Sequence, residues 1–415
     1  MFLPQKRQPI EYREHKIMKI LHIIPSITLL GGGSNVAAIN IVKALRIASI
    51  DAEIVTTNDN FGTVLDVPVN RWIEYDQGLP VLFFSKIYTG IKFISEYTLA
   101  LDYHNWLWNN IENYDLVHIH SFFSYLCTLG AIIARLKKVK YIISPHGQLD
   151  SWVINQKKIK KMVYYTLLEQ QNLENASAIY CTTNQEAQDV KNFGIKSPTF
   201  ILPLGVTPLV DLPDAKINIR TIYHIASNIP IVLFMSRFHP KKHMELLLYA
   251  AHNLAKRHNF HLILAGSGNP EYEQYIFNLV LSLNLNEVTT FSGFVHGENK
   301  TLLLQGADIF VLPSYGENFA ITVAEAMAYG LPVIVTPEVQ ISPEIEANKT
   351  GIVVSGKLEA WVQAIEKLLI SEELRTEMGE NGRLLARTKY DWDVIAKELS
   401  IIYQDIIDNK PLASL

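Results

Sequence analysis

The most constraining feature of this chain is a regular alternation between short apolar runs rich in β-branched residues and longer segments of helical periodicity. A strand pattern at Ile20 to Ile24 is followed by a helical pattern at Val36 to Leu45 and a second strand pattern at Ala52 to Thr56. Such alternation predicts parallel strands joined by crossover helices, with ligand sites at the carboxyl ends of the strands. Further strands of this first series are predicted at Leu116 to Ile119, Tyr141 to Ser144, Ala178 to Cys181 and Thr199 to Leu202.

A second series of the same kind follows a polar stretch from Pro208 to Asn228. At 415 residues the chain is long enough for two domains, each with its own core. We therefore predict an α/β protein with two Rossmann-like parallel-sheet domains, 18–207 and 208–392, behind a polar N-terminal extension at 1–17. The strands predicted for the second series are Ile231 to Met235, His261 to Ala265, Val288 to Ser292, Ile309 to Leu312, Val333 to Thr336 and Gly351 to Val354, and the closing helices are Leu358 to Leu369 and Asp393 to Ile407.

Charge and composition narrow the functional classes. The net charge is −4, with residues 1 to 210 at +3 and the remainder at −7, so the basic balance of a nucleic-acid-binding protein is missing. The sequence has no run of 18 apolar residues that could span a bilayer, and residues 1–17 lack the apolar core of a signal peptide. Cys127 and Cys181 lack metal-ligand spacing, which favours a reduced, cytoplasmic location.

A segment with two glutamates carries the strongest functional signal. Glu317 and Glu325 lie eight positions apart, and a helical pattern runs from Phe319 to Tyr329. If the whole span were helical, the carboxylates would be about 12 Å apart along the axis, which is too far for a paired-carboxylate hydrolase. Free amides at a helix start suit a diphosphate, and here we expect them at Asn318, Phe319 and Ala320.

A basic loop follows the first strand of the second series. It places Arg237 and Lys242 five positions apart between a strand and a helix. A planar guanidinium and a compact ammonium together suit a diphosphate, because fixed cations stabilise the charge that develops on a leaving phosphate oxygen. A solvated basic loop is the alternative.

Together these motifs resemble the family 4 retaining glycosyltransferases of GT-B fold, and the resemblance spans nearly the whole chain from Met18. It implies that Glu317 contacts the donor sugar and that Glu325 contacts the ribose. Arg237 and Lys242 match the cations that hold the donor diphosphate, although His243 stands where the family usually has glycine.

The resemblance also implies an architecture and a mechanism. Two domains would face each other across a cleft, and the last helix, about 393–415, would pack back onto the first domain. Retention without a carboxylate nucleophile implies attack on the same face of the sugar as the departing phosphate, which takes the proton of the acceptor.

Three smaller segments match the cleft of this family. The loop Gly31 to Gly33 precedes a helix and would border the donor phosphates or the acceptor, but it lacks the GxGxxG spacing of a nicotinamide site. A small-residue turn ends at Gly268 and lets a ligand approach the backbone. Ser292 to Val295 resembles the place where the family receives the nucleobase, with a core role for Phe294 as the alternative. We assign Gly32, Gly33, Gly268 and Val295 to donor binding.

Histidines stand at the carboxyl ends of two predicted strands. Period-two alternation puts His118 and His120 on one face, with His120 nearer the mouth of the site. By resemblance, His146 matches the cleft histidine that lies near the donor sugar, and we assign it to catalysis. A core role is expected for His118, whereas His120 is open between a core role and contact with the acceptor.

Neither a metal nor another cofactor is expected. The DxD triplet Asp391 to Asp393 opens the last helix, where we predict Asp393 as the N-cap and Trp392 as a packing anchor. Cationic side chains and helix amides would then hold the diphosphate.

A basic, aromatic-rich region suggests a membrane partner. Lys157, Lys158, Lys160 and Lys161 alternate with apolar residues, and the segment Val81 to Trp108 is rich in aromatic side chains. We expect docking on the anionic inner face of the plasma membrane, where a lipid-linked acceptor would lie. An ordinary solvated helix face is the alternative.

The sequence thus predicts a glycosyltransferase that uses a nucleotide-sugar donor and a glycan or lipid-linked acceptor in cell-surface polysaccharide or glycolipid synthesis. Other reactions on the same fold are alternatives, namely those of a nucleotide-sugar epimerase or a sugar phosphorylase. A third alternative is a non-catalytic subunit that binds nucleotide sugars to regulate a partner.

Overall fold

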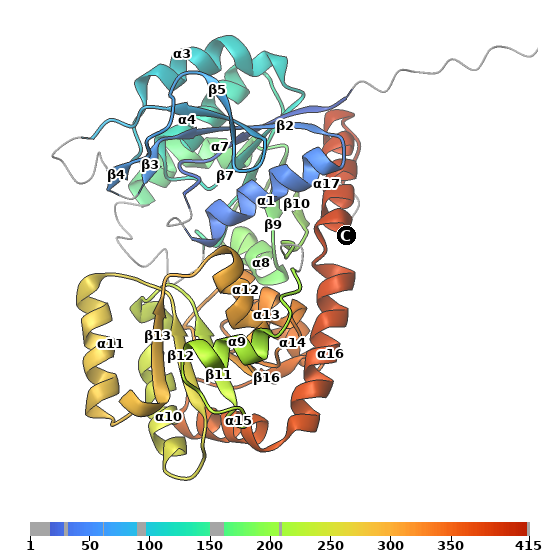
Figure 1. Ribbon diagram of the computed structural model, residues 1–415. Coiled ribbons are helices and arrows are strands. Elements are labelled where there is room, and N and C mark those ends of the chain that lie inside the picture. The colour runs from blue at the N-terminus through green and yellow to red at the C-terminus, as the bar shows by residue number, and fades with distance from the viewer. Residues whose placement is uncertain are drawn as a thin grey trace, which may run out of the picture.

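The computed structural model describes residues 17–28, 32–60, 62–88, 97–149, 162–206 and 210–412. Two sheets, each flanked by helices, lie one above the other, as Figure 1 shows. The first unit is blue to green and the second runs from yellow-green to red. The predicted α/β fold with two Rossmann-like parallel-sheet units is therefore confirmed.

The first sheet has eight strands in the order β10-β9-β8-β7-β1-β2-β6-β5. Neighbouring strands are parallel except for β5 and β6, which form an antiparallel edge. The carboxyl ends of its parallel strands therefore share one edge. The strands are β1 (Lys19–Ile23), β2 (Asp51–Thr57), β5 (Trp72–Tyr75), β6 (Leu79–Phe84), β7 (Leu116–His120), β8 (Tyr141–Ser144), β9 (Ala178–Cys181) and β10 (Thr199–Ile201), and a separate hairpin joins β3 (Asp59–Asn60) to β4 (Thr63–Val64).

Helices cover both faces of this sheet. One face packs against α1 and the C-terminal helix, and the other packs against α3, α4 and α7. The alternation of buried residues along β1 and β7 explains this, since successive side chains enter opposite layers. The helices are α1 (Gly33–Ile47), α3 (Leu101–Asn110), α4 (Tyr125–Leu136), α7 (Gln170–Glu174) and α8 (Asn184–Asn192), with a 3-10 turn η2 (Ile111–Asn113) and a π-helical turn η3 (Tyr165–Glu169).

Much of the segment that was expected to face a membrane is core instead. Val81 and the rest of β6 are buried, because this strand pairs with β2 on one side and β5 on the other. Tyr103 and Leu107 of α3 are also fully buried, whereas Trp108 is 43% exposed. The aromatic content of Val81 to Trp108 therefore reflects packing over most of its described part.

The second sheet has six parallel strands in the order β13-β12-β11-β14-β15-β16. Its four inner strands are short and buried on both faces, as expected for a sheet covered by crossover helices, whereas the edge strands β13 and β16 are half-buried. They are β11 (Ile231–Met235), β12 (His261–Ala265), β13 (Thr289–Gly293), β14 (Ile309–Leu312), β15 (Val333–Val335) and β16 (Gly351–Val353).

Two closing helices were predicted from the sequence, but the helix between them, α16, was missed. Helix α16 carries Gly379 and Gly382, which disguise its helical pattern. A Cβ at Gly379 would lie 2.2 Å from the carbonyl oxygen of Gly330, so the glycine permits close approach to the end of α13. The helices are α9 (Ala215–Ile222), α10 (Met244–Ala255), α11 (Pro270–Ser282), α12 (Gly297–Gly306), α13 (Ile321–Ala328), α14 (Ser342–Ala347), α15 (Leu358–Ile370), α16 (Glu372–Lys389) and α17 (Trp392–Ile407), with 3-10 turns η4 (Pro240–Lys242) and η5 (Asn286–Val288).

The chain passes between the units at two adjacent places. Val206 forms an isolated parallel bridge with Asp391, and its N–H donates to the carbonyl of Tyr390 at 2.8 Å. Trp392 lies against Gly205, where a Cβ would be 2.3 Å from the indole ring. These contacts place the two crossings side by side.

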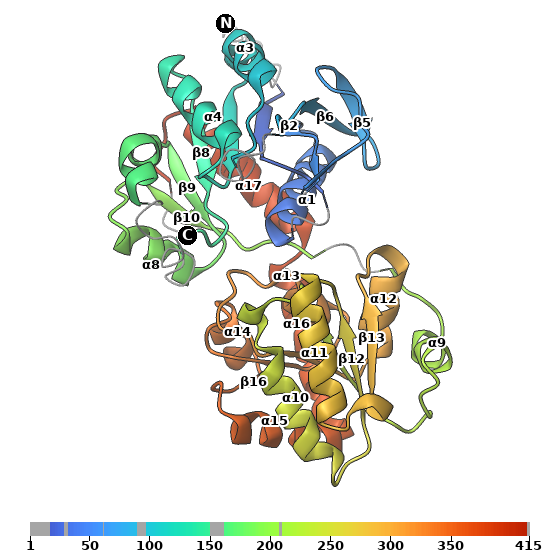
Figure 2. The same cartoon turned by 90° about the vertical axis from the view of Figure 1, so that its left-hand side faces the viewer.

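Helix α17 returns to the first unit, as both views show (Figures 1 and 2). The Tyr403 hydroxyl lies 2.6 Å from His118 Nδ1, and Lys140 donates to the carbonyl of Ile407 at 2.8 Å. The N-cap of α17 is Asp391, whose side chain accepts the N–H of Asp393 at 2.7 Å. The prediction of Asp393 as the cap was wrong, because the helix begins one residue earlier than its apolar pattern.

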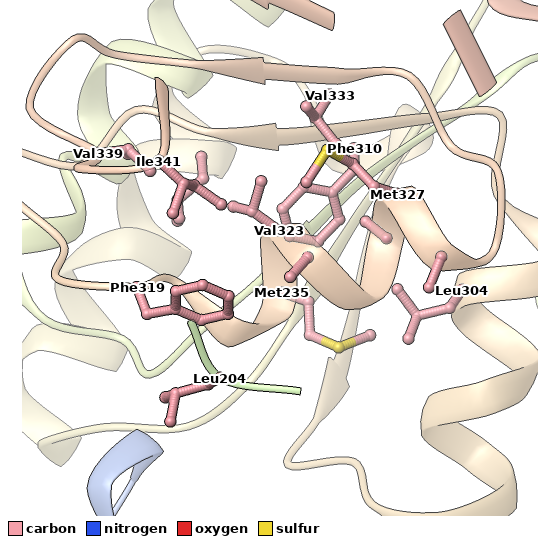
Figure 3. Packing of buried hydrophobic residues seen from close by; sticks show 14 of the residues in the cluster. Leu204, Met235, Leu304, Phe310, Phe319, Val323, Met327, Val333, Val339 and Ile341 are labelled. Carbon is pink, nitrogen blue, oxygen red and sulfur yellow. The ribbon is translucent and has the colours of Figure 1, made fainter. Parts of the chain in front are cut away.

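The core of the second unit fixes the position of α13. Figure 3 shows Val323 and Met327 packed against Phe310 of β14, and all three are fully buried. The ring of Phe319 enters the same core and lies edge-on to Tyr390 at 5.2 Å between centroids. Phe319 was predicted to bind the donor, but its side chain is a core group, so only its backbone remains for that role.

Candidate active site

The carboxyl ends of β11 and β14 bring a lysine and a glutamate together. Lys242 forms an ion pair with Glu317, and the Ser314 hydroxyl donates to the same carboxylate oxygen at 2.7 Å. The Lys242 and Glu317 side chains are 13% and 15% exposed. Burial alone would raise the pKa of Glu317, but Lys242 and Ser314 outweigh burial and the pKa is lowered. The carboxylate therefore stays charged beside its cation.

Backbone pairing holds Glu317 in place outside any helix. Its N–H donates to the carbonyl of Glu338 at 3.1 Å, and its own carbonyl accepts the N–H of Gln340 at 3.1 Å. Two adjacent loops thus position the carboxylate. The premise of one continuous helix between Glu317 and Glu325 does not hold, so the axial separation expected from it does not apply.

The helix start differs from the prediction by two residues. Ala320 adopts a left-handed conformation with φ of 53°, and α13 begins at Ile321. This turn separates the helix from the preceding loop. The first helical turn therefore offers the N–H groups of Ile321 and Thr322, with Ala320 as the N-cap, and Asn318 and Phe319 lie in the loop before it.

The structure shows how the basic loop accommodates His243 at the position where the family usually has glycine. This residue has φ of 51° and ψ of 45°, the left-handed conformation that favours glycine, and its ring stacks on Tyr315 at 4.2 Å. The loop therefore keeps a glycine-like turn with a histidine in it. Arg237 is exposed at the start of the loop and has no ion-pair partner within the described ranges, so its guanidinium is available to an anion.

Glu325 occupies a second, more deeply buried site on α13. It is 4% exposed, and Lys300 of α12 lies 2.5 Å from its Oε1. Its other oxygen, Oε2, is buried without a hydrogen-bond partner among the residues that the structure describes. An unmet carboxylate oxygen of this kind suits a hydroxyl donor.

A cavity of about 460 Å³ opens beside the carboxyl ends of β12 and β13. Gly266 and Gly293 line it, together with three aromatic rings. Gly268 pairs with Phe238 at its edge, whereas Phe294 is 46% exposed and Val295 is partly buried outside the lining. The nucleobase prediction thus fits the turn at Gly293 better than Val295, and Phe294 is not a core residue. The aromatic lining is Phe238, Phe277 and Phe291.

The first unit approaches the start of α13 through the start of α1. Gly32 has φ of 83° and precedes the helix, and a Cβ at Gly33 would lie 3.7 Å from the side chain of Ile321. The N-termini of α1 and α13 are therefore close, which concentrates two positive helix ends at the junction of the units. Gly31 lies outside the described residues.

A chain of histidines leads from the first sheet to the same junction. His22 Nδ1 lies 2.9 Å from His120 Nε2, and His120 Nδ1 lies 3.1 Å from His146 Nε2. His118 stacks on His120 at 4.0 Å but bonds to Ser144 at 2.7 Å and to α17. No local pattern pointed to His22, because its position depends on strand pairing with β7.

Burial keeps these rings neutral. It lowers the pKa of His22 to about 3 and that of His146 to about 4, and it places the pKa of His118 and of His120 well below the usual range. His120 is fully buried, so it supports His146 rather than contacting an acceptor directly, contrary to one of the two predicted roles.

Three of the histidines approach metal-ligand spacing. One nitrogen each from His22, His118 and His120 lies within 4.8 Å of the others. However, the 2.9 Å between His22 and His120 is a hydrogen-bond length, and both nitrogens of His118 already have partners. Hydrogen bonding accounts for this cluster except at His22 Nε2, which is buried without a partner among the described residues.

Other predicted partners are not described by the structure. Lys157, Lys158, Lys160 and Lys161 lie outside the described residues. Within the described part of the chain, no helix is both long and apolar enough to cross a bilayer.

Two family models match successive halves of the chain. The model for Glycosyltransferase Family 4 matches residues 31–208, and the model for Glycosyl transferases group 1 matches residues 215–385. An uncharacterised glycosyltransferase of Methanocaldococcus jannaschii is 28% identical over 312 residues, which cover 71% of this chain and 76% of the relative. A D-inositol 3-phosphate glycosyltransferase of Corynebacterium aurimucosum is 25% identical over 407 residues, covering 90% and 91%.

Solved structures share the complete architecture. A sucrose-phosphate synthase from Thermosynechococcus elongatus aligns with a TM-score of 0.77 at 21% identity, over 95% of this chain and all of the other. The Anabaena protein HepE, in complex with UDP and glucose, aligns with a TM-score of 0.76 at 19% identity, over 94% of this chain and all of the other. The two family models together cover most of the chain and show that it belongs to the family 4 glycosyltransferases, and the solved structures show that its fold is GT-B.

Proposed function

We propose that this glycosyltransferase moves a hexose from a nucleotide-sugar donor to a glycan or lipid-linked acceptor with retention of the anomeric configuration. The observation that supports this most is the ion pair of Lys242 with Glu317. It keeps a cation and a charged carboxylate ready at the carboxyl ends of β11 and β14. A phosphate can replace Glu317 as the partner of Lys242, while a sugar hydroxyl replaces Lys242 as the partner of Glu317.

The roles of the surrounding groups follow from their chemistry. Arg237 and Lys242 hold the diphosphate, and the N-termini of α1 and α13 add backbone donors. Glu325 accepts a ribose hydroxyl through its unpartnered Oε2. His146 contacts the sugar as a neutral hydrogen-bonding group.

In the proposed reaction the bond between the anomeric carbon and the phosphate oxygen breaks, and the acceptor oxygen forms a bond to the same face of that carbon. The departing diphosphate takes the acceptor proton, so no enzyme carboxylate is needed as nucleophile. Lys242 and Arg237 stabilise the charge that develops on the leaving oxygen. Neither a metal nor another cofactor enters this scheme.

The test is a screen of the purified chain with UDP-, GDP- and ADP-sugars, measuring release of nucleoside diphosphate with and without acceptors. UDP-glucose comes first because HepE was solved with UDP and glucose, and inositol phosphate is included because of the corynebacterial relatives. Release that depends on acceptor, together with the anomeric configuration of the product by NMR, would establish the reaction. Conversion of the donor without acceptor would instead indicate an epimerase.

Matched variants separate transfer from binding. Glu317→Gln removes the charge at the site, whereas Glu338→Gln removes an exposed charge in the adjoining loop. Loss of turnover in the first alone supports the proposal. Nucleotide binding without turnover for any acceptor, unaffected by Glu317→Gln, would identify a regulatory binding subunit.

We also propose that the first unit docks on an anionic membrane. The four lysines between 157 and 161 directly precede exposed apolar side chains. Flotation with vesicles containing anionic lipid should fall when all four lysines become glutamine, and equal flotation would remove the hypothesis. The exposed apolar residues that follow are Met162, Val163, Leu167 and Leu168.

A further inference from the structure

A buried carboxylate joins the loop of His146 to the end of β9, and the proposed chemistry does not use it. Glu186 of α8 is 1% exposed. Its Oε1 accepts the N–H of Gly147 at 2.6 Å, and its Oε2 accepts the N–H and hydroxyl of Thr182 at 2.7 and 2.9 Å. Since Gly147 directly follows His146, Glu186 fixes the loop that carries this histidine.

Two amide side chains of the second unit reach the same end of α8, which lies at the edge of the first unit that faces the second (Figure 1). Asn318 donates through Nδ2 to the Thr182 hydroxyl at 2.9 Å. The side-chain oxygen of Gln340 accepts the hydroxyl of Thr183. Both amides belong to the loops that hold Glu317, since Asn318 follows it in the chain and Gln340 bonds to its carbonyl.

The loops also touch directly. A Cβ at Gly147, which has φ of 76°, would lie 3.0 Å from Asn318 Cβ, so a glycine is needed for this approach. Asn318 Oδ1 is buried without a partner in the described structure. The amide is therefore held across the junction by its donor side alone.

Ordinary helix capping does not explain Glu186. Thr183 is the N-cap of α8 and accepts the N–H of Glu186 at 3.1 Å. In a capping box, the glutamate would return the bond to the N-cap N–H. Glu186 instead bonds to Thr182 and to Gly147, which lies 39 residues earlier in the chain. Its two oxygens meet three donors, a match that glutamine cannot reproduce because its NH₂ group would face an N–H.

We propose that Glu186, Asn318 and Gln340 form a clasp that fixes the position of the two units relative to each other. Glu186 is then a positioning residue that sets the distance between His146 and Glu317. Its effect on transfer rests on the proposed function, whereas the clasp itself does not. The partner that this surface recognises is the other unit of the same chain.

The experiment tests Glu186→Gln, Asn318→Ala and the double variant Glu186→Gln/Asn318→Ala. The control is Gln188→Ala, at an exposed residue of α8 whose side-chain hydrogen bond stays within its helix. Donor turnover, nucleoside diphosphate affinity and thermal unfolding are measured for each. Small-angle scattering of the ligand-free chain reports the separation of the units for Asn318→Ala/Gln340→Ala.

We expect Glu186→Gln and Asn318→Ala to lower kcat by about 10- to 100-fold, because small misplacements of reacting groups cost that much. Nucleotide affinity should change far less, since Arg237, Lys242 and Glu325, the side chains proposed to hold the nucleotide, all belong to the second unit. The double variant Glu186→Gln/Asn318→Ala should be no slower than the slower of its two single variants, because both substitutions disrupt the same clasp. The radius of gyration should rise for Asn318→Ala/Gln340→Ala and stay constant for Gln188→Ala.

Unchanged kcat in both single variants, or a loss that multiplies in the double variant, would overturn the positioning role. An unchanged radius of gyration would overturn the clasp. Should the wild-type chain show no transfer, the proposed function fails, while the scattering result still decides the clasp. Loss of nucleotide affinity in parallel with thermal stability would mean that Glu186 serves only the fold.

Discussion

The second unit presents its candidate site groups as ion pairs, whereas the first unit presents neutral rings. Glu317 and Glu325 each have a lysine partner, and the pKa of Glu317 is lowered beside Lys242. His22, His120 and His146 form a hydrogen-bonded chain in which burial keeps every ring neutral. The difference follows from the elements that carry them.

The histidines lie on or directly after central strands of the first sheet, where burial in a low dielectric disfavours a proton. Glu325 lies within α13 and Glu317 in the loop before it, where lysines from α12 and from the loop after β11 reach them. From this comparison we infer that the ion pairs of the second unit can exchange their partners for those of a charged ligand. The neutral histidine chain of the first unit instead keeps the geometry of its side of the site.

The largest effect is expected from breaking the ion pair. Lys242→Ala leaves Glu317 buried without its cation and removes a donor to the leaving phosphate, so kcat should fall about 100- to 1000-fold. Burial would then raise the pKa of Glu317, which should move the acid limb of the activity profile to higher pH. Steady-state kinetics across pH give both quantities, with Glu338→Gln as control. A wild-type profile in Lys242→Ala would contradict the pairing.

A smaller effect should follow from the backbone of the nucleotide pocket. A Cβ at Gly266 would lie 1.9 Å from the Ser236 carbonyl oxygen, so Gly266→Ala should weaken nucleoside diphosphate binding more than tenfold. Gly293 has φ of 70° but open space around it, so Gly293→Ala should cost about 1 kcal/mol of stability and little affinity. Calorimetric titration and thermal unfolding distinguish the two. Equal effects would mean that backbone conformation, rather than the carbonyl contact, limits the site.

A moderate effect is expected at the second ion pair. Lys300→Met leaves Glu325 with neither oxygen paired, and donor KM should rise about tenfold with little change in kcat, because the contact is present before and during the reaction. In the wild type, a donor with a 2′-deoxyribose should have a higher KM than the ordinary donor. This difference in KM should disappear in Glu325→Gln. Lys216→Met, at an exposed pair with Asp308, is the control. A change confined to kcat would argue against ribose binding.

The smallest effect concerns acid stability of the first unit. The folded pKa of His22 is depressed to about 3 from an ordinary 6.5, so the unfolded chain binds the proton that the folded chain excludes. Stability is then complete above about pH 6.5 and falls as the pH drops from there toward 3, by up to about 1.4 kcal/mol per pH unit for one such histidine. Denaturant unfolding at pH 7 and pH 5 should show a shallower loss in His22→Leu. If the loss of stability between pH 7 and pH 5 is the same in the wild type and in His22→Leu, then the folded chain does not exclude the proton from His22.

Local patterns in the sequence predicted the sheet strands best where both faces are buried. The strands Tyr141–Ser144, Ala178–Cys181 and Ile309–Leu312 have the predicted ends, since a continuous apolar run bounded by polar residues has little ambiguity. Strand β5 was not predicted, and β6 was missed because most of it falls in the aromatic-rich segment that was attributed to a membrane surface. Helix α16 was missed because its glycines serve a contact with a distant loop.

The site shows the same division. The spacing of Arg237, Lys242, Glu317 and Glu325 was sufficient to place all four after or beside strands of one sheet, where the sequence predicts a diphosphate-binding region. Their roles in catalysis remain predictions. Helix start, by contrast, was misplaced, because the left-handed turn at Ala320 depends on Phe319 entering the core.

By itself the sequence determined the two parallel sheets and the charged groups at their carboxyl ends, because these follow from periodicity and from residues close together in the chain. Only the tertiary structure decided which lysine meets which glutamate, that His22 completes the histidine chain, and that Glu186 ties the His146 loop to Asn318 through Thr182. These pairings join residues tens to hundreds of positions apart. Local propensity carries no information about such contacts, since strand order and the packing of the two units create them.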